Sequence, residues 1–171
     1  MKLVIASDIH GSAHWCQQLM QAIEREAPDN VLLLGDLLYH GPRNPLPEGH
    51  DAARTAQMLN SIASKVIAVR GNCEAEVDQM VLDFPCMADY VELFDDQQRI
   101  FATHGHIFGP DNVPALPAGS ALLYGHFHEQ RDQVVDGIRF VNPGSVALPK
   151  DGKHGYAVYN SGMFELCTFE G

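Results

Sequence analysis

The sequence lacks the features that would place it in a membrane or in an export pathway. It contains no apolar run near the roughly 18 residues that a membrane-spanning helix needs. Its first residues also lack a basic segment followed by an apolar stretch and a small-residue cleavage site, so no secretory signal peptide is indicated. The cytoplasm is therefore the expected compartment.

Paired cysteines are missing as well. The four cysteines, Cys16, Cys73, Cys86 and Cys167, lie far apart in the chain, and none forms a CxxC pair. In a chain without an export signal, such cysteines are expected to be reduced thiols and not a disulfide framework.

Positive charge is scarce, since 11 Lys and Arg residues stand against 22 Asp and Glu residues, for a formal net charge of −11. This balance disfavours binding to long nucleic acid or to an anionic membrane surface. If the substrate is an anion, the side chains supply too little positive charge to bind it, and bound metal cations could supply that charge instead.

The chain of 171 residues, 46% of them hydrophobic, is long enough for one domain over 1–171 with a full core. Its first part predicts strand–helix–strand units with a parallel sheet. Buried strands are expected at 3–6, 31–34 and 65–70, and helices at 13–27 (with Ser12 as N-cap), 52–63 and 75–82. Shorter, alternating strands follow and suggest hairpins in a more antiparallel second sheet. These strands are expected at 89–94, 98–103, 120–125, 132–135, 138–142, 155–160 and 163–168.

Side chains able to bind metal follow five of these strands, in the patterns D-x-H, G-D, G-N, H-G-H and G-H-x-H. The ends of parallel strands joined by right-handed crossovers meet at one sheet edge, where open α/β sheets bind their ligands. Core packing alone does not explain five such coincidences. The candidate metal ligands are Asp8, His10, Asp36, Asn72, His104, His126 and His128.

Seven ligands exceed what one cation needs. If Asp36, which is central in the order, is shared between two cations, three further ligands remain for each. This number of ligands is typical of a two-metal site, in which the ions lie roughly 3.5–4 Å apart and activate a water for attack on phosphorus. Mixed Asp and His ligands suit Zn²⁺, Mn²⁺ or Fe²⁺.

The order of these motifs resembles the signature of calcineurin-like metallophosphoesterases over nearly the whole chain. The segments around Asp36, 40–44, 68–73, 103–106 and 142–145 are similar to the small bacterial phosphodiesterases of the YfcE type. The resemblance implies an α/β fold, a four-layer αββα sandwich of two mixed β-sheets flanked by helices. It also allows a dimer or tetramer.

The same resemblance implies how the ligands divide between two metal ions. One ion is expected on Asp8, His10, Asp36 and His128, and the other on Asp36, Asn72, His104 and His126. Mn²⁺ is the expected activating metal, with Zn²⁺, Fe²⁺ and Ni²⁺ as alternatives.

Cys73 departs from the wider family, which has His in this position as the expected acid for the leaving group. A thiol is a poor general acid near neutral pH, so activated aryl esters should be favoured over alkyl esters. Cys73 could instead be a small residue that shapes the site, or a metal ligand. Asn72, Cys73, His104 and His106 are the candidate catalytic residues.

The substrate contacts are less clearly marked in the sequence. His106 could reach the phosphate or orient His104. The proline-rich loop 39–50 carries His40 and Arg43, which could meet a phosphate or simply lie on the surface. The turn Asn142–Ser145 is expected to support the His126–His128 loop.

The function predicted from these residues is metal-dependent hydrolysis of a small phosphodiester. A phosphomonoesterase or nucleotidase on the same site is the alternative within enzymes. A non-catalytic binding scaffold on the same fold is the alternative outside them, but all seven candidate ligands are present, and a scaffold would be expected to lose some of them.

Overall fold

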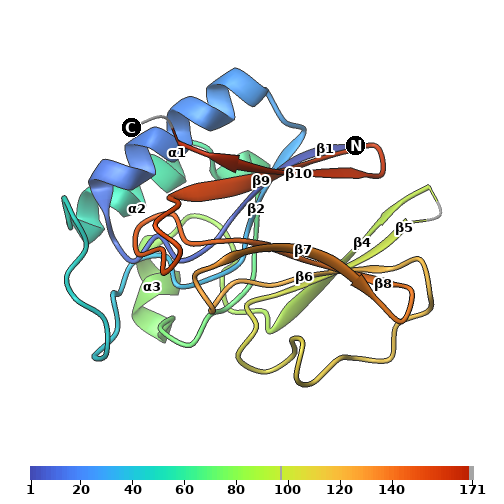
Figure 1. The fold of residues 1–171 in the computed structure, drawn as a ribbon. Coiled ribbons are helices and arrows are strands. Elements are labelled where there is room, and N and C mark those ends of the chain that lie inside the picture. Colours follow the sequence, from blue (N-terminus) through green and yellow to red (C-terminus); the bar gives the residue numbers. More distant parts are fainter. Residues whose placement is uncertain (97, 170–171) are drawn as a thin grey trace.

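A computed structural model describes residues 1–96 and 98–169 of the chain. Two mixed five-stranded sheets pack face to face, and helix α1 (Ala13–Glu26) lies on the outer side of the first sheet (Figure 1). The predicted α/β class with two mixed sheets and helices is confirmed.

The first sheet has the strand order β10-β9-β1-β2-β3, and β1, β2 and β3 run parallel. Its strands are β1 (Lys2–Ala6), β2 (Asn30–Leu33), β3 (Val66–Ala68), β9 (Gly155–Asn160) and β10 (Met163–Thr168). Helix α1 connects β1 to β2, α2 (Ala52–Asn60) lies between β2 and β3, and α3 (Glu76–Val81) follows β3. The predicted strand–helix–strand order is confirmed, and Ser12 caps α1 by accepting a hydrogen bond from the Trp15 backbone.

Alternation along β1 separates two cores. Val4 and Ala6 pack against the helices, whereas Leu3 and Ile5 pack against the second sheet. Successive side chains of a strand point to opposite faces, so a strand buried on both faces reads as a continuous apolar run. This explains why the strand could be recognised from its composition.

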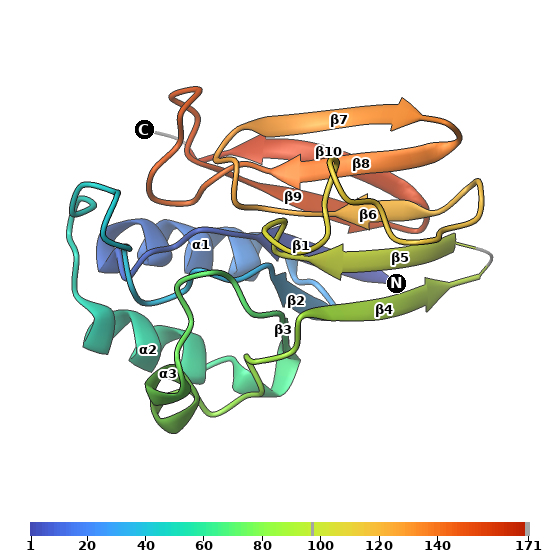
Figure 2. The same ribbon diagram turned by 90° about the horizontal axis from the view of Figure 1, so that it is seen from below.

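The second sheet has the order β4-β5-β6-β8-β7. Its strands are β4 (Tyr90–Asp95), β5 (Gln98–Thr103), β6 (Ala121–Leu123), β7 (Gln130–Val135) and β8 (Ile138–Pro143). The central strands β5, β6 and β8 are parallel, and the two edge strands are antiparallel to their neighbours. Figure 2 shows the arrowheads of β5 and β8 on the same side of the molecule.

Two predictions about the second sheet need correction. The hairpin of β9 and β10 joins the first sheet, where β9 pairs with β1, and the second sheet has a parallel centre. The reason is burial, because β9 contributes Val158 to the helix-side core and Tyr159 to the core between the sheets. A strand that is buried on both faces belongs inside a sandwich and not in a separate hairpin.

All helices of the described residues precede β4 in the chain. The outer face of the second sheet, which points away from the first sheet, is therefore covered by a loop, whereas the predicted four-layer sandwich has helices there. There Leu116, from the loop before β6, packs on Leu122, Tyr124 and Phe140.

Helix α2 ends at Asn60, before the predicted limit of 63, and a single 3-10 turn covers Ala63–Lys65. The Ser61 hydroxyl donates to the Met58 carbonyl at 2.6 Å, a local bond that competes with helix continuation.

Candidate metal centre

The loops that follow β1 and β2 run side by side at the edge of the first sheet. The backbone N–H of Asp8 donates to Gly35 O at 3.1 Å, and that of His10 donates to Asp36 O at 2.9 Å. Gly35 has a positive φ of 91°, and a Cβ there would collide with the backbone of Gly71. Only glycine permits this close approach, which brings the Asp36 loop against both neighbouring loops.

Five of the seven predicted ligands adopt the left-handed backbone conformation. Their φ values lie between 50° and 66°, at Asp8, His10, Asp36, His126 and His128. For a residue with a Cβ, this conformation costs roughly 1–2 kcal/mol. The surrounding contacts therefore hold these side chains in place against local backbone preference, as is common at functional sites.

Three of the predicted histidines are oriented in the same way. In each, the Nδ1–H donates to a backbone carbonyl, which can only accept, so Nε2 keeps its lone pair for a metal. The pairs are His10 with Tyr39 O (2.8 Å), His104 with Leu34 O (2.6 Å) and His128 with Leu148 O (2.7 Å).

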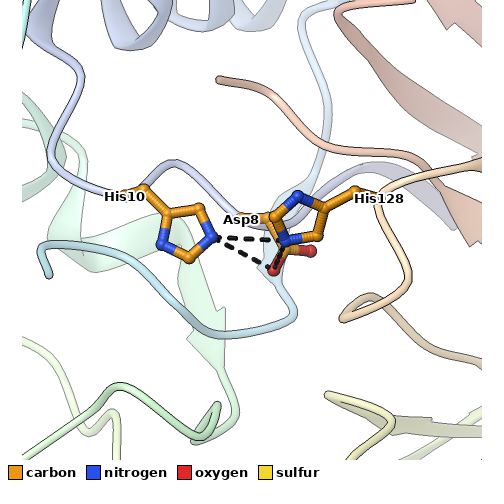
Figure 3. A group of neighbouring side chains, drawn as sticks. All are labelled: Asp8, His10 and His128. Atoms are coloured by element: carbon orange, nitrogen blue, oxygen red, sulfur yellow. Dashed lines mark hydrogen bonds and ion pairs between the residues drawn. The ribbon is translucent and has the colours of Figure 1, made fainter. Parts of the chain in front are cut away.

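The Nε2 atoms of His10 and His128 lie 3.3 Å apart, and Asp8 Oδ1 lies 3.6 Å from the first and 3.1 Å from the second (Figure 3). All three side chains are buried, and Asp8 Oδ1 has no hydrogen-bond partner among the described residues. Burial alone would raise the pKa of Asp8, but contacts with His10 and His128 hold that pKa well below its ordinary value. An ionised carboxylate facing two imidazole lone pairs fits a divalent cation.

A second group of ligand atoms adjoins the first. Asp36 Oδ2 lies 3.6 Å from His104 Nε2 and 3.9 Å from His10 Nε2, so Asp36 stands between the two sets of ligands. Asn72 Oδ1 lies 3.1 Å from His104 Nε2. The position of Asp36 fits the bridging role predicted for it.

His126 is less tightly placed. Its backbone N–H donates to Asp8 Oδ2 at 3.0 Å, and its ring centroid lies 5.1 Å from that of His104. Among the described residues, however, its nitrogens belong to none of the groups of ligand atoms that converge within 4.8 Å. The structure thus brings Asp8, His10, Asp36, His104 and His128 together closely, with Asn72 and His126 beside them.

A model of the calcineurin-like phosphoesterase superfamily domain matches residues 1–162. The chain belongs to this superfamily. It is 49% identical over 156 residues to phosphodiesterase YfcE of Escherichia coli K12, which covers 89% of this chain and 83% of the relative. The solved structure of YfcE, a phosphoesterase from E. coli, has a TM-score of 0.96 and 44% identity and covers 99% of this chain and 93% of that chain. The predicted resemblance is confirmed.

The same fold occurs in Vps29 from Entamoeba histolytica, solved with Zn²⁺. That match has a TM-score of 0.60 and 19% identity and covers 96% of this chain and 89% of that chain. None of the helices in residues 1–96 and 98–169 is long and apolar enough to cross a bilayer.

Glu74 is a supporting residue of this phosphoesterase site that the sequence analysis did not find. Its buried carboxylate accepts three backbone hydrogen bonds, from Asp36 (2.8 Å), Leu37 (2.7 Å) and Gly71 (2.5 Å). It thereby ties the Asp36 loop to the end of β3. Its place directly after the G-N-C motif was the available signal.

Cys73 faces the same centre. Its backbone N–H donates to Asp36 Oδ1 at 2.8 Å, and its Sγ lies within 4.8 Å of ligand atoms of His10 and Asp36. Burial, together with the Asp36 carboxylate, raises the pKa of the Cys73 thiol. This geometry is compatible with all three interpretations of Cys73 and places it beside the reacting centre.

The turn at Asn142–Ser145 supports the site through hydrogen bonds. Asn142 Nδ2 donates to Gly125 O at 2.9 Å, directly before the His126–His128 loop, and Ser145 Oγ donates to Asp8 O at 2.9 Å. The structural role predicted for this turn is confirmed.

The other predicted site residues lie at the rim. Burial, His104 and Arg70 lower the pKa of His106, whose ring centroid lies 5.3 Å from that of His104. Since both ring nitrogens of His104 face other atoms, an orienting role for His106 gains no support, and contact with substrate stays a prediction.

A cavity of about 730 Å³ opens in front of the centre and is lined by Asp36, Cys73 and His128, among others. Arg43 lines it, whereas His40 lines a separate cavity of about 630 Å³ beside α2 and α3. Lys150, which the sequence analysis did not single out, lines the first cavity as well.

Proposed function

We propose that this protein is a phosphodiesterase that uses two divalent cations, with Mn²⁺ as the expected metal. The observation that carries this proposal is the convergence of two carboxylates and three imidazoles beside a cavity that Asp36 and His128 line. The 49% identity to phosphodiesterase YfcE supports the choice of a diester as substrate.

The candidate ligands form two sets, one for each cation. Asp8, His10 and His128 would hold one cation, and His104, Asn72 and His126 the other, with Asp36 between them. Bound cations would receive the non-bridging phosphate oxygens and lower the pKa of a water that attacks phosphorus. Asp8 and Asp36 would supply the negative charge that retains the cations, and the carbonyl-bound histidines keep the lone pair on Nε2, where it would face the metal.

Cys73 sets the expected leaving-group preference. A thiol is a weaker acid than imidazolium, and burial beside Asp36 raises its pKa further, so it would assist a poor leaving group less than imidazolium. We therefore expect rapid hydrolysis of aryl diesters and slower hydrolysis of alkyl esters.

The test is hydrolysis of bis-p-nitrophenyl phosphate and p-nitrophenyl phosphate by metal-stripped protein titrated with Mn²⁺. Turnover that depends on Mn²⁺ and favours the diester is the expected result. A preference for the monoester would support the phosphomonoesterase alternative. Bound metal without turnover of either substrate would support the scaffold alternative.

A further inference from the structure

The main cavity collects basic side chains that have no partner elsewhere. Of the 11 Lys and Arg residues in the chain, most make an ion pair or a side-chain hydrogen bond. Within residues 1–96 and 98–169, the side chains without such a contact are Arg43, Lys150 and Lys153. Two of these three line the cavity in front of the metal centre.

Both basic residues belong to loops that are anchored to the site. The Lys150 backbone N–H donates to His128 O at 2.9 Å. On the other loop, a Cβ added to Gly41 would lie 3.1 Å from Cys73 Sγ, so the backbone before Arg43 packs on Cys73. The backbone that carries Arg43 and Lys150 is therefore anchored beside the metal centre, and both side chains are exposed there.

A smaller cavity of about 310 Å³ adjoins the same centre, and His126 lines both cavities. Its described lining contains Ile107 and Phe127 together with His106, Asn112 and Asp111, and no Lys or Arg. A negative group would be repelled there, whereas an uncharged organic group could pack on the apolar side chains. The first cavity also has two carboxylates in its lining, but Glu74 is buried and accepts three backbone hydrogen bonds, and Asp36 faces the metal site. The exposed charges that a substituent would meet are therefore positive in the first cavity and negative in the second.

We propose that the substrate is an unsymmetrical phosphodiester. One ester substituent carries a further anionic group, a carboxylate or a phosphate, which binds Arg43 and Lys150. The other substituent is uncharged and occupies the cavity of Ile107 and Phe127. This inference rests on the proposed phosphodiesterase function, in which the cations receive the reacting phosphate and leave the two basic residues for the second anion.

The test compares two diesters that differ only in charge, 4-nitrophenyl 3-carboxyphenyl phosphate and its 3-carbamoylphenyl counterpart. Wild-type protein with Mn²⁺ should show a kcat/KM about fivefold higher for the carboxylate, the effect of one favourable exposed ion pair. Added salt should reduce this ratio, since exposed charges are screened. The Lys150→Gln variant should lower the ratio and an Arg43→Gln/Lys150→Gln double variant should bring it close to one, whereas Lys153→Gln, outside the cavity, should keep the wild-type ratio.

Three results would overturn the inference. These are equal kcat/KM for both diesters in the wild-type protein, a preference that persists in an Arg43→Gln/Lys150→Gln double variant, and an equal loss on both diesters in Lys150→Gln. The last result would show that Lys150 contacts the reacting phosphate.

Failure of the phosphodiesterase proposal has a separate signature, because neither diester would then be hydrolysed. In that case the inference is judged by calorimetric binding of 3-carboxyphenyl phosphate and 3-carbamoylphenyl phosphate to the Mn²⁺-loaded protein. Tighter binding of the carboxylate that is lost in the Arg43→Gln/Lys150→Gln double variant would support the anion site, and equal binding would overturn it.

Discussion

The two halves of the metal centre differ in how completely the fold forms them. In the first half, Asp8, His10 and His128 are buried, and their ligand atoms lie within 3.6 Å of one another. In the second half, Asp36 and His104 are buried, but Asn72 is exposed and His126 stands apart from the converging atoms.

This difference has a physical reason. Asn72 and His126 both line the main cavity and are less buried than the ligands of the first half, of which only His128 reaches that cavity. Backbone carbonyls orient both histidines of the first half. In the second half, Asn72 is exposed and His126 lies outside the converging atoms, so these two side chains would have to become ordered for a cation to bind. Ordering side chains costs conformational entropy, so the second half should bind its cation more weakly.

The largest expected effect comes from removing the residue that joins the halves. Asp36→Asn should weaken metal binding in both halves and lower kcat/KM by more than about 100-fold, beyond the usual effect of losing a supporting contact to a metal ligand. Diester hydrolysis and metal content per chain are the measurements. Turnover at the wild-type level would contradict the bridging role.

The next prediction separates the halves. His128→Ala should weaken the tighter of two Mn²⁺ binding steps by about 100-fold, and His126→Ala should weaken only the other step, by about tenfold. Calorimetric titration of metal-stripped protein measures both. If both variants weakened the tighter step equally, the two halves of the centre would not bind their cations separately.

Glu74 tests whether the second half depends on its supporting carboxylate. Glu74→Gln places an amide where three backbone N–H groups need an acceptor, and should lower the free energy of unfolding by about 1–3 kcal/mol. Urea denaturation of the metal-stripped protein gives this value. Glu165→Gln, on an exposed position of β10, is the matched control and should leave it unchanged.

The smallest expected effect concerns Cys73, at the border of the two halves. The substrate for this test is an alkyl 4-nitrophenyl phosphodiester, and the reaction of interest is cleavage of its alkyl ester bond. Cys73→His should raise kcat for that cleavage by about tenfold, which is less than the usual contribution of a general acid. Product analysis by phosphorus NMR measures it. No gain on the poor leaving group would favour the interpretation of Cys73 as a residue that only shapes the site.

Much of this centre was predictable because its residues follow strands of recognisable composition. The apolar runs of β1 and β2 end at Asp8 and Asp36, and parallel topology requires such ends to share an edge. The pairing of β9 with β1 was not predicted. The run Gly155–Tyr159 is buried on both faces, but composition does not specify which strand a buried strand will pair with.

The sequence by itself determined the family, the order of strands and helices, and the side chains that meet at the sheet edge. Only the tertiary structure decided how they meet. The acceptors that orient His10, His104 and His128 are backbone carbonyls, which every residue carries and which leave no trace in composition. Likewise, the looser position of His126 and the place of Lys150 in the cavity depend on loop paths, which distant contacts determine.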